Sequence, residues 1–127
     1  MASKMLHTCL RVENLEASID FYEKAFGFKE LRRKDFPDHQ FTIVYLGLEG
    51  DDYELELTYN YDHGPYVIGD GFAHIAISSD DLEGLHAEHA AAGFEVTEPK
   101  GLPGNPPNYY FVKDPDGYKV EVIRTKK

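Results

Sequence analysis

The sequence has little with which to form covalent cross-links or to cross a membrane. Its 127 residues include one cysteine and no tryptophan, and a single cysteine excludes an internal disulfide. No apolar run reaches the length of a membrane-spanning helix, and the N-terminal residues have no apolar core of an export signal. We therefore expect a cytoplasmic protein that does not associate with membranes.

Positive charge is also scarce. Lys and Arg number 13 against 23 Asp and Glu, which gives a formal net charge of -10. Such a chain repels nucleic acids and anionic lipids, so we expect neither as a partner. Core-forming residues are abundant, because 42% of the chain is hydrophobic and 13% is aromatic. This composition predicts a single folded domain over residues 1–127.

The first half of the chain reads as a strand, a helix and three more strands. Residues 6–12 alternate between apolar and polar positions, as a half-buried strand does. Asn14 is a suitable N-cap for an amphipathic helix, and Gly27 is a suitable stop signal. Three further strands are expected at 28–33, 41–48 and 53–59.

The second half repeats this order. The expected elements are a strand at 74–78, a helix between Asp81 and Gly93, and strands at 95–98, 109–113 and 118–124. A repeat of this length is too long for a solenoid unit and indicates two paired modules. The sequence therefore predicts an α+β fold of two tandem β-α-β-β-β modules, at about 5–62 and 72–125.

Two histidines and two glutamates occupy equivalent positions of these modules. His74 follows His7 by 67 residues and Glu121 follows Glu56 by 65, against 66 residues between the two Gly-Phe dipeptides. Taken singly, each residue would be an ordinary surface residue, but the repeat makes them a set. Two imidazoles and two carboxylates suit a borderline divalent ion such as Ni²⁺, Co²⁺, Zn²⁺ or Fe²⁺, with positions left for water. We predict a catalytic metal site of these four ligands.

Several segments resemble the glyoxalase I (lactoylglutathione lyase) family of the vicinal oxygen chelate superfamily. They are LHTCLRV at 6–12, ELTYN at 56–60, HIA at 74–76 and DPDGYKVE at 114–121. The resemblance implies curved mixed sheets around a metal site. It also implies isomerisation of the methylglyoxal-glutathione hemithioacetal to S-lactoylglutathione through an enediolate. One divalent metal per site, with Ni²⁺ or Co²⁺ preferred and Zn²⁺ as an alternative, and glutathione as co-substrate are then expected.

The resemblance also assigns roles to individual residues. Glu121 is the expected catalytic base and Glu56 is the second catalytic carboxylate, so either could dominate. Arg11 and Asn60 match positions that contact the glutathione part of the substrate. The loop before the penultimate strand departs from the family, because Lys100 lies earlier than the basic residue usually found there. Lys100 is a substrate-binding candidate only if it swings in, and the thiol could be one other than glutathione.

The family builds its site from modules of two chains, so the resemblance implies a homodimer with sites at the subunit interface. Pairing of the modules within one chain is the alternative. Two other functions fit less well: another metalloenzyme of the superfamily, such as an epimerase, thiol transferase or dioxygenase, and a metal-free resistance protein that sequesters its ligand. We interpret Cys9 as an ordinary half-buried thiol and the two helix histidines, His86 and His89, as structural or solvated.

Overall fold

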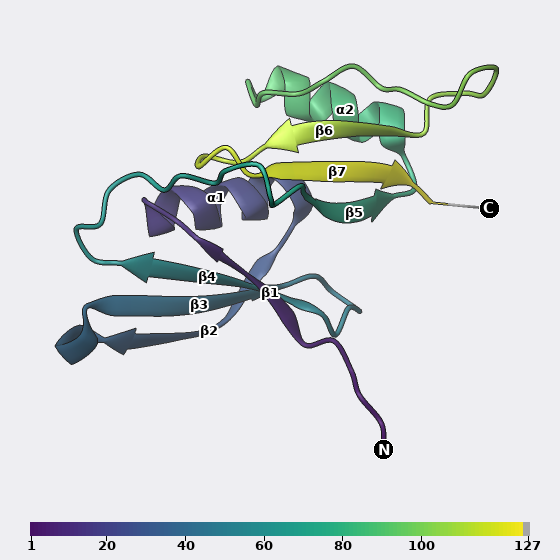
Figure 1. Ribbon diagram of the computed structural model, residues 1–127. Helices are drawn as coiled ribbons and strands as arrows, with labels where there is room; N and C mark the ends of the chain where they lie inside the picture. The colour runs from purple at the N-terminus through teal and green to yellow at the C-terminus, as the bar shows by residue number, and fades with distance from the viewer. Residues whose placement is uncertain (126–127) are drawn as a thin grey trace. The chain divides into compact units, whose positions relative to one another are not determined.

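A computed structural model describes residues 1–125 and divides into two compact units, Met1–Val67 and a second that begins at Ile68. Each unit contains one mixed β-sheet and one α-helix that packs against it (Figure 1). The two mixed sheets confirm the expected α+β fold. Among the described residues, no helix is long and apolar enough to cross a membrane.

The first unit is a four-stranded sheet in the order β1-β4-β3-β2, with β1 parallel to β4 and the other pairs antiparallel. Its elements are β1 (His7–Arg11), α1 (Leu15–Phe26), β2 (Lys29–Phe36), a 3-10 turn (Pro37–His39), β3 (Phe41–Gly47) and β4 (Glu54–Asn60). Leu10, Leu46 and Leu57 are buried on one face. Because successive strand residues point to opposite faces, the polar residues of β1 and β4 occupy the other face.

Helix α1 begins and ends where the sequence predicts. Asn14 Oδ1 accepts a hydrogen bond from the backbone N of Ala17 at 3.1 Å, which satisfies one of the unpaired amides of the first turn. Gly27 has a φ of 80° and its amide returns to the carbonyls of the last turn, a left-handed cap that favours glycine. The helix buries Tyr22 completely, and Ile19 and Phe26 lie half-buried at the edge of the apolar stripe.

Replacing Asn14 with Ala is expected to lower the free energy of unfolding by about 1 kcal/mol, because the Ala17 amide loses its side-chain acceptor. Urea denaturation followed by circular dichroism measures the difference. Asn14→Ser is the matched control, since a serine hydroxyl can accept the same hydrogen bond. Equal stability of the Ala and Ser variants would contradict the capping role.

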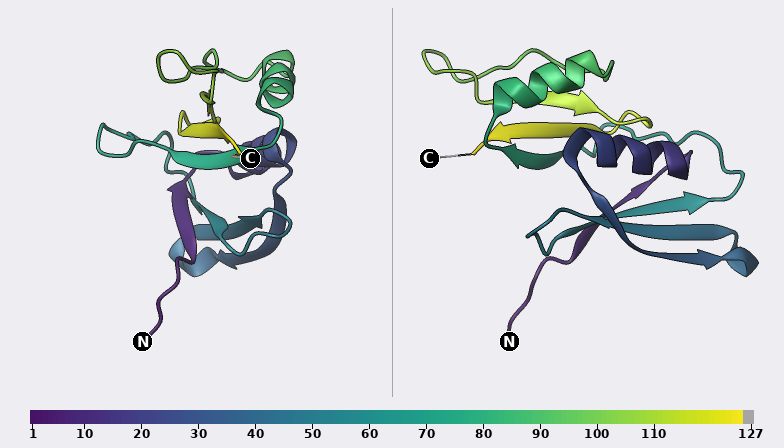
Figure 2. Two further views of the ribbon diagram at one scale, coloured as in Figure 1. Left: turned by 90° about the vertical axis from the view of Figure 1, so that its right-hand side faces the viewer. Right: turned by 180° about the vertical axis from the view of Figure 1, so that it is seen from behind.

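The second unit is a three-stranded sheet in the order β5-β7-β6, with β5 parallel to β7 and β6 antiparallel to it. Its elements are β5 (Ile75–Ser79), α2 (Leu82–Ala91), β6 (Tyr109–Lys113) and β7 (Lys119–Arg124). Figure 2 shows α2 running along one face of this sheet. Leu82, Tyr110, Val120 and Val122 are buried, so the other face again carries the alternate residues of each strand.

One expected strand is corrected by the structure. Residues 95–98 form only isolated bridges to β6 rather than a fourth strand. The backbone N of Phe111 donates to the Thr97 hydroxyl at 2.9 Å, so a side chain takes the place of a carbonyl in the ladder. Pro99 then follows, and proline has no amide hydrogen with which to extend the pairing.

Candidate metal centre

In the first unit, His7 and Glu56 lie together on the polar face of the sheet. The parallel register of β1 and β4 places Cys9 opposite Glu56, so His7 reaches across from one strand position earlier on the same face. His7 Nε2 lies 3.1 Å from Glu56 Oε1. Glu56 is buried while the imidazole of His7 is partly exposed, so this pair opens toward the polar face.

The second unit repeats this geometry. His74 immediately precedes β5, and the parallel register of β5 and β7 places Ala76 opposite Glu121. His74 Nε2 lies 3.1 Å from Glu121 Oε1, the same separation of the same atoms as in the first unit. The prediction that each module pairs one histidine with one glutamate is therefore supported by the contacts within each unit.

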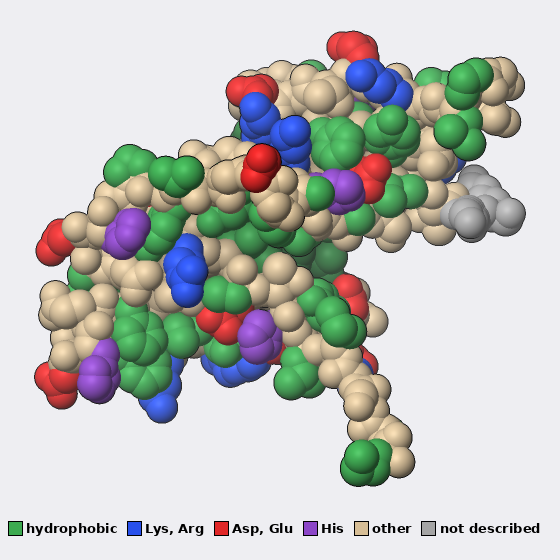
Figure 3. Space-filling view, in the orientation of Figure 1, with side chains coloured by type: hydrophobic (Ala, Val, Ile, Leu, Met, Phe, Trp, Pro, Cys, Tyr) green, Lys and Arg blue, Asp and Glu red, His purple; other side chains and the backbone are tan. Residues whose placement is uncertain are grey.

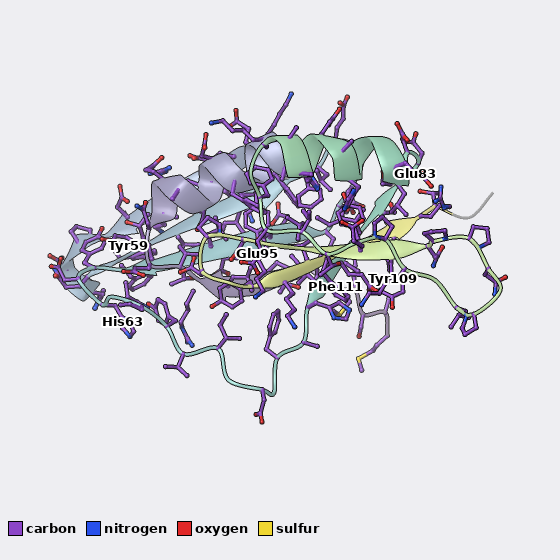
Figure 4. All side chains as sticks on the ribbon, turned by 90° about the horizontal axis from the view of Figure 1, so that it is seen from above. Tyr59, His63, Glu83, Glu95, Tyr109 and Phe111 are labelled. Atoms are coloured by element: carbon purple, nitrogen blue, oxygen red, sulfur yellow. The ribbon has the colours of Figure 1, made fainter. Side chains whose placement is uncertain are left out.

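An aromatic ring supports each histidine from the neighbouring strand. Tyr45 is the β3 partner of Glu56, and its ring meets His7 edge to face at 5.7 Å between centroids. Phe111 is the β6 partner of Glu121 and meets His74 in the same manner at 5.3 Å. Figure 4 labels Phe111 on β6 next to Tyr109, whose ring it also contacts. Packing of this kind fixes the orientation of the imidazoles.

The donor atoms of both pairs fit a divalent metal ion. Nitrogen and oxygen ligands bind such ions at about 2.1 Å, so two neighbouring ligands at right angles lie about 3 Å apart. The 3.1 Å separations match this value. Figure 3 shows histidine beside acidic side chains on one face of each unit. Within residues 1–125, no three His, Cys, Asp or Glu side chains are clustered closely enough to hold a metal ion, so each pair is a half-site.

Hydrogen bonds to Glu56 favour its ionised form. Its Oε2 accepts from the Thr58 hydroxyl at 2.7 Å and from the Cys9 thiol at 3.2 Å. Burial opposes ionisation, yet the hydrogen bonds from Thr58, Cys9 and Tyr45 together with the nearby His7 lower the pKa of Glu56 below its usual range. Burial in turn raises the pKa of the Cys9 thiol, which keeps it protonated and able to donate.

An arginine stands next to the first half-site and was not expected from the sequence. Arg32 makes two hydrogen bonds to Glu54, at 2.7 and 2.8 Å, and its guanidinium lies 4.0 Å from the ring centroid of Tyr45. This ion pair lowers the pKa of Glu54, so Glu54 stays charge-neutralised beside the site. Alternation along β2 was too weak a signal to reveal Arg32, because most residues of that strand are exposed.

The predicted substrate-binding residues lie in both units. Arg11 ends β1, on the face that also carries His7, with Thr58 as its β4 partner. Asn60 ends β4 and its side-chain amide donates to the Tyr66 hydroxyl at 2.8 Å. Lys100 belongs to the second unit, where its side chain is exposed and its backbone pairs with β6. Their roles toward a substrate stay predictions.

A hollow of about 470 Å³ opens beside the second half-site. Its lining includes His74, Phe111 and Lys119. A concave surface of this size that combines apolar walls with a few polar groups is typical of small-molecule sites. Lys119 also supplies positive charge, which an acidic chain needs in order to receive an anionic ligand.

The other histidines of the second unit are structural, as the sequence analysis expects. His89 is 2% exposed and its Nδ1 lies 2.9 Å from the buried Tyr110 hydroxyl. His86 Nε2 lies 3.0 Å from the carbonyl oxygen of Thr97. Both therefore secure α2 to the edge of the sheet. The Asp114 turn is also structural, because the Asp114 carboxylate accepts from the backbone N of Tyr118 at 2.9 Å.

Sequence reasoning missed the three residues that contact Glu56. Tyr45 and Thr58 were not singled out, and Cys9 was interpreted as an ordinary thiol. The repeat contained a usable signal, because Tyr45 and Phe111 are 66 residues apart, the offset of the modules. Aligning the modules residue by residue would have placed both aromatic rings beside the predicted ligands.

Comparison with known proteins identifies relatives over nearly the whole chain. The family model described as the Glyoxalase/Bleomycin resistance protein/Dioxygenase superfamily matches residues 4–122. A lactoylglutathione lyase of Neisseria meningitidis is 43% identical over 126 residues, which cover 97% of this chain and 91% of that protein.

Solved structures agree. Glyoxalase I of Leishmania major, described as trypanothione-dependent, superimposes with a TM-score of 0.87 at 35% identity and covers 97% of this chain and 87% of that one. Glyoxalase I of Zea mays gives a TM-score of 0.89 at 39% identity, covering 98% of this chain and 45% of the longer maize chain. The relatives and the paired half-sites thus point in the same direction.

Proposed function

The chain belongs to the glyoxalase/bleomycin resistance protein/dioxygenase superfamily, and we propose that within it the protein is a lactoylglutathione lyase, a glyoxalase I. The observation that carries this proposal is the repeated His–Glu pair, 3.1 Å apart in each unit, in a chain 43% identical to a lactoylglutathione lyase. Homology to glyoxalase I implies a small-molecule substrate, a divalent metal and glutathione.

The reaction isomerises the hemithioacetal of methylglyoxal and glutathione to S-lactoylglutathione. A proton leaves the carbon that bears the thioether, an enediolate forms, and a proton is returned to the neighbouring carbon, so no external oxidant is needed. A divalent metal ion supplies a Lewis acid that stabilises the negative charge developing on the substrate oxygens.

Glu121 is the residue that we assign as the base. It is partly exposed, next to His74 and beside the hollow of the second unit, so a bound substrate can approach its carboxylate. A carboxylate positioned within hydrogen-bond reach of an acidified C–H can remove its proton. Glu56 is the second carboxylate, and its contacts with Thr58 and Cys9 favour a role as a stationary ligand.

The complete metal site contains His7, Glu56, His74 and Glu121 in this proposal. Each unit supplies one imidazole and one carboxylate, and a set of two nitrogen and two oxygen donors suits Ni²⁺ or Co²⁺, with Zn²⁺ as a weaker alternative. The two units are then the modules of one domain over residues 1–127. In a homodimer, the half-site of one subunit would face the complementary half-site of its partner.

Arg11, Asn60 and Lys100 are the proposed contacts for the thiol part of the substrate. Arg11 lies on the face of β1 that carries His7, and Asn60 ends the strand of Glu56. An arginine can bind a carboxylate group of the thiol through two hydrogen bonds. Lys100 is exposed and can move without disturbing its backbone pairing.

Thioester formation from methylglyoxal and glutathione, followed by ultraviolet absorbance, tests the proposal together with a metal analysis of the purified protein. We expect bound metal and a steady rise of the thioester signal. Bound metal without thioester formation would instead favour another enzyme of the superfamily, such as an epimerase. Metal-free protein without activity would favour a ligand-sequestering protein.

A further inference from the structure

The carboxylate of Glu56 has hydrogen-bond donors on three sides. Cys9 is its partner on β1, Tyr45 is its partner on β3, and Thr58 follows two residues later on the same face of β4. Thr58 and Cys9 both donate to Oε2, at 2.7 and 3.2 Å, and the Tyr45 hydroxyl also donates to this carboxylate. Oε1 is left to face His7, 3.1 Å away.

Glu121 occupies the equivalent position of the second unit, yet its neighbours differ in chemistry. Its partners on β5 and β6 are Ala76 and Phe111, and Ile123 follows two residues later on the same face of β7. None of these three side chains has a hydrogen-bond donor. Within residues 1–125, His74 is the side-chain partner of the Glu121 carboxylate.

We propose that Thr58, Cys9 and Tyr45 are positioning residues that hold Glu56 as the fixed carboxylate of the metal site, whereas Glu121 is free to move. This inference rests on the proposed function and goes beyond it, because it assigns roles to residues that neither touch the substrate nor bind the metal. The same backbone register thus presents one restrained carboxylate and one unrestrained carboxylate.

The physical basis is the orientation of a ligand before the metal arrives. A carboxylate that is hydrogen-bonded through one oxygen presents the other in a fixed direction, so less conformational freedom is lost when metal binds. Replacement of a residue that orients a ligand in this way costs about 10- to 100-fold in metal affinity. A base has the opposite requirement, since its carboxylate must turn toward the substrate proton.

Thr58→Val tests the proposal, because valine keeps the shape of threonine and removes its hydroxyl. We expect the affinity of metal-free protein for Ni²⁺ and Co²⁺, measured by competition with a chromophoric chelator, to fall about tenfold. Thr58→Ser retains the hydroxyl and should restore the affinity. Ile123→Val is the matched control, because it places valine at the equivalent position beside Glu121, and its affinity should equal that of wild type.

Metal affinity of Thr58→Val equal to that of wild type, in protein with an unchanged unfolding midpoint, would overturn the proposal. If Thr58→Val does not fold, the double change of Cys9→Ala and Tyr45→Phe serves instead, since alanine and phenylalanine already stand at the matching positions 76 and 111. Unchanged affinity of that variant would equally overturn it. Wild-type protein that binds metal but forms no thioester would refute the proposed reaction alone, because the affinity comparison does not depend on turnover.

Discussion

Replacing Glu121 with Gln is expected to lower kcat by about a thousandfold, because an amide cannot accept the substrate proton and general-base catalysis is typically worth 10²–10⁴-fold. KM should stay within a few-fold of wild type, since the contacts assigned to the thiol part lie elsewhere. Initial rates of thioester formation over a range of hemithioacetal concentrations separate the two constants.

Two further variants make this result specific. Glu95→Gln, in the same unit, removes a carboxylate that pairs with Lys113 at 2.9 Å outside the half-site, and its rates should equal those of wild type. Glu56→Gln should weaken metal binding as well as turnover. Full activity of Glu121→Gln would reject Glu121 as the base, and a loss of kcat in Glu56→Gln at unchanged metal affinity would transfer that role to Glu56.

Removal of the metal is expected to abolish activity and to lower stability at once. Protein treated with a chelator and desalted should form no thioester, and addition of Ni²⁺ or Co²⁺ should restore the rate more fully than Zn²⁺. A ligand that binds only the folded state at 100 times its dissociation constant adds about 2.7 kcal/mol to the free energy of unfolding. Thermal unfolding with and without metal measures this second effect.

The stability measurement keeps this test independent of the assay. A metal that raises the unfolding temperature without restoring the rate occupies the site but does not support the reaction, and comparison of ions then identifies the active one. Full activity after removal of all metal would contradict the four-ligand site. Greater restoration by Zn²⁺ than by Ni²⁺ or Co²⁺ would contradict the proposed metal preference.

Local signals in the sequence were sufficient for the helices. Asn14 and Gly27 are chemically suited to the two ends of α1, and the structure places the cap hydrogen bond and the left-handed glycine there. Asp81 caps α2 in the same manner through the backbone N of Gly84. Caps act over three or four residues, so their outcome depends little on the rest of the chain.

Strand pairing was harder to predict because it depends on residues far apart in the chain. Cys9 and Glu56 are brought together by a parallel register between strands 47 residues apart, and no local pattern specifies that register. Residues 95–98 alternate as a strand does, yet Thr97 takes the ladder hydrogen bond with its hydroxyl. The repeat alone allowed the two His–Glu pairs to be predicted, since it relates distant positions without requiring the pairing to be known.

The equal register of the two sheets has a consequence for how such a protein can diverge. When a duplicated half keeps its backbone, the His–Glu distance is preserved, as the 3.1 Å separations in both units show. Substitutions at the three neighbouring positions can then give one copy a new chemical character without altering the geometry of either. Gene duplication followed by a few side-chain changes is therefore enough to convert a symmetric scaffold into one with a division of labour.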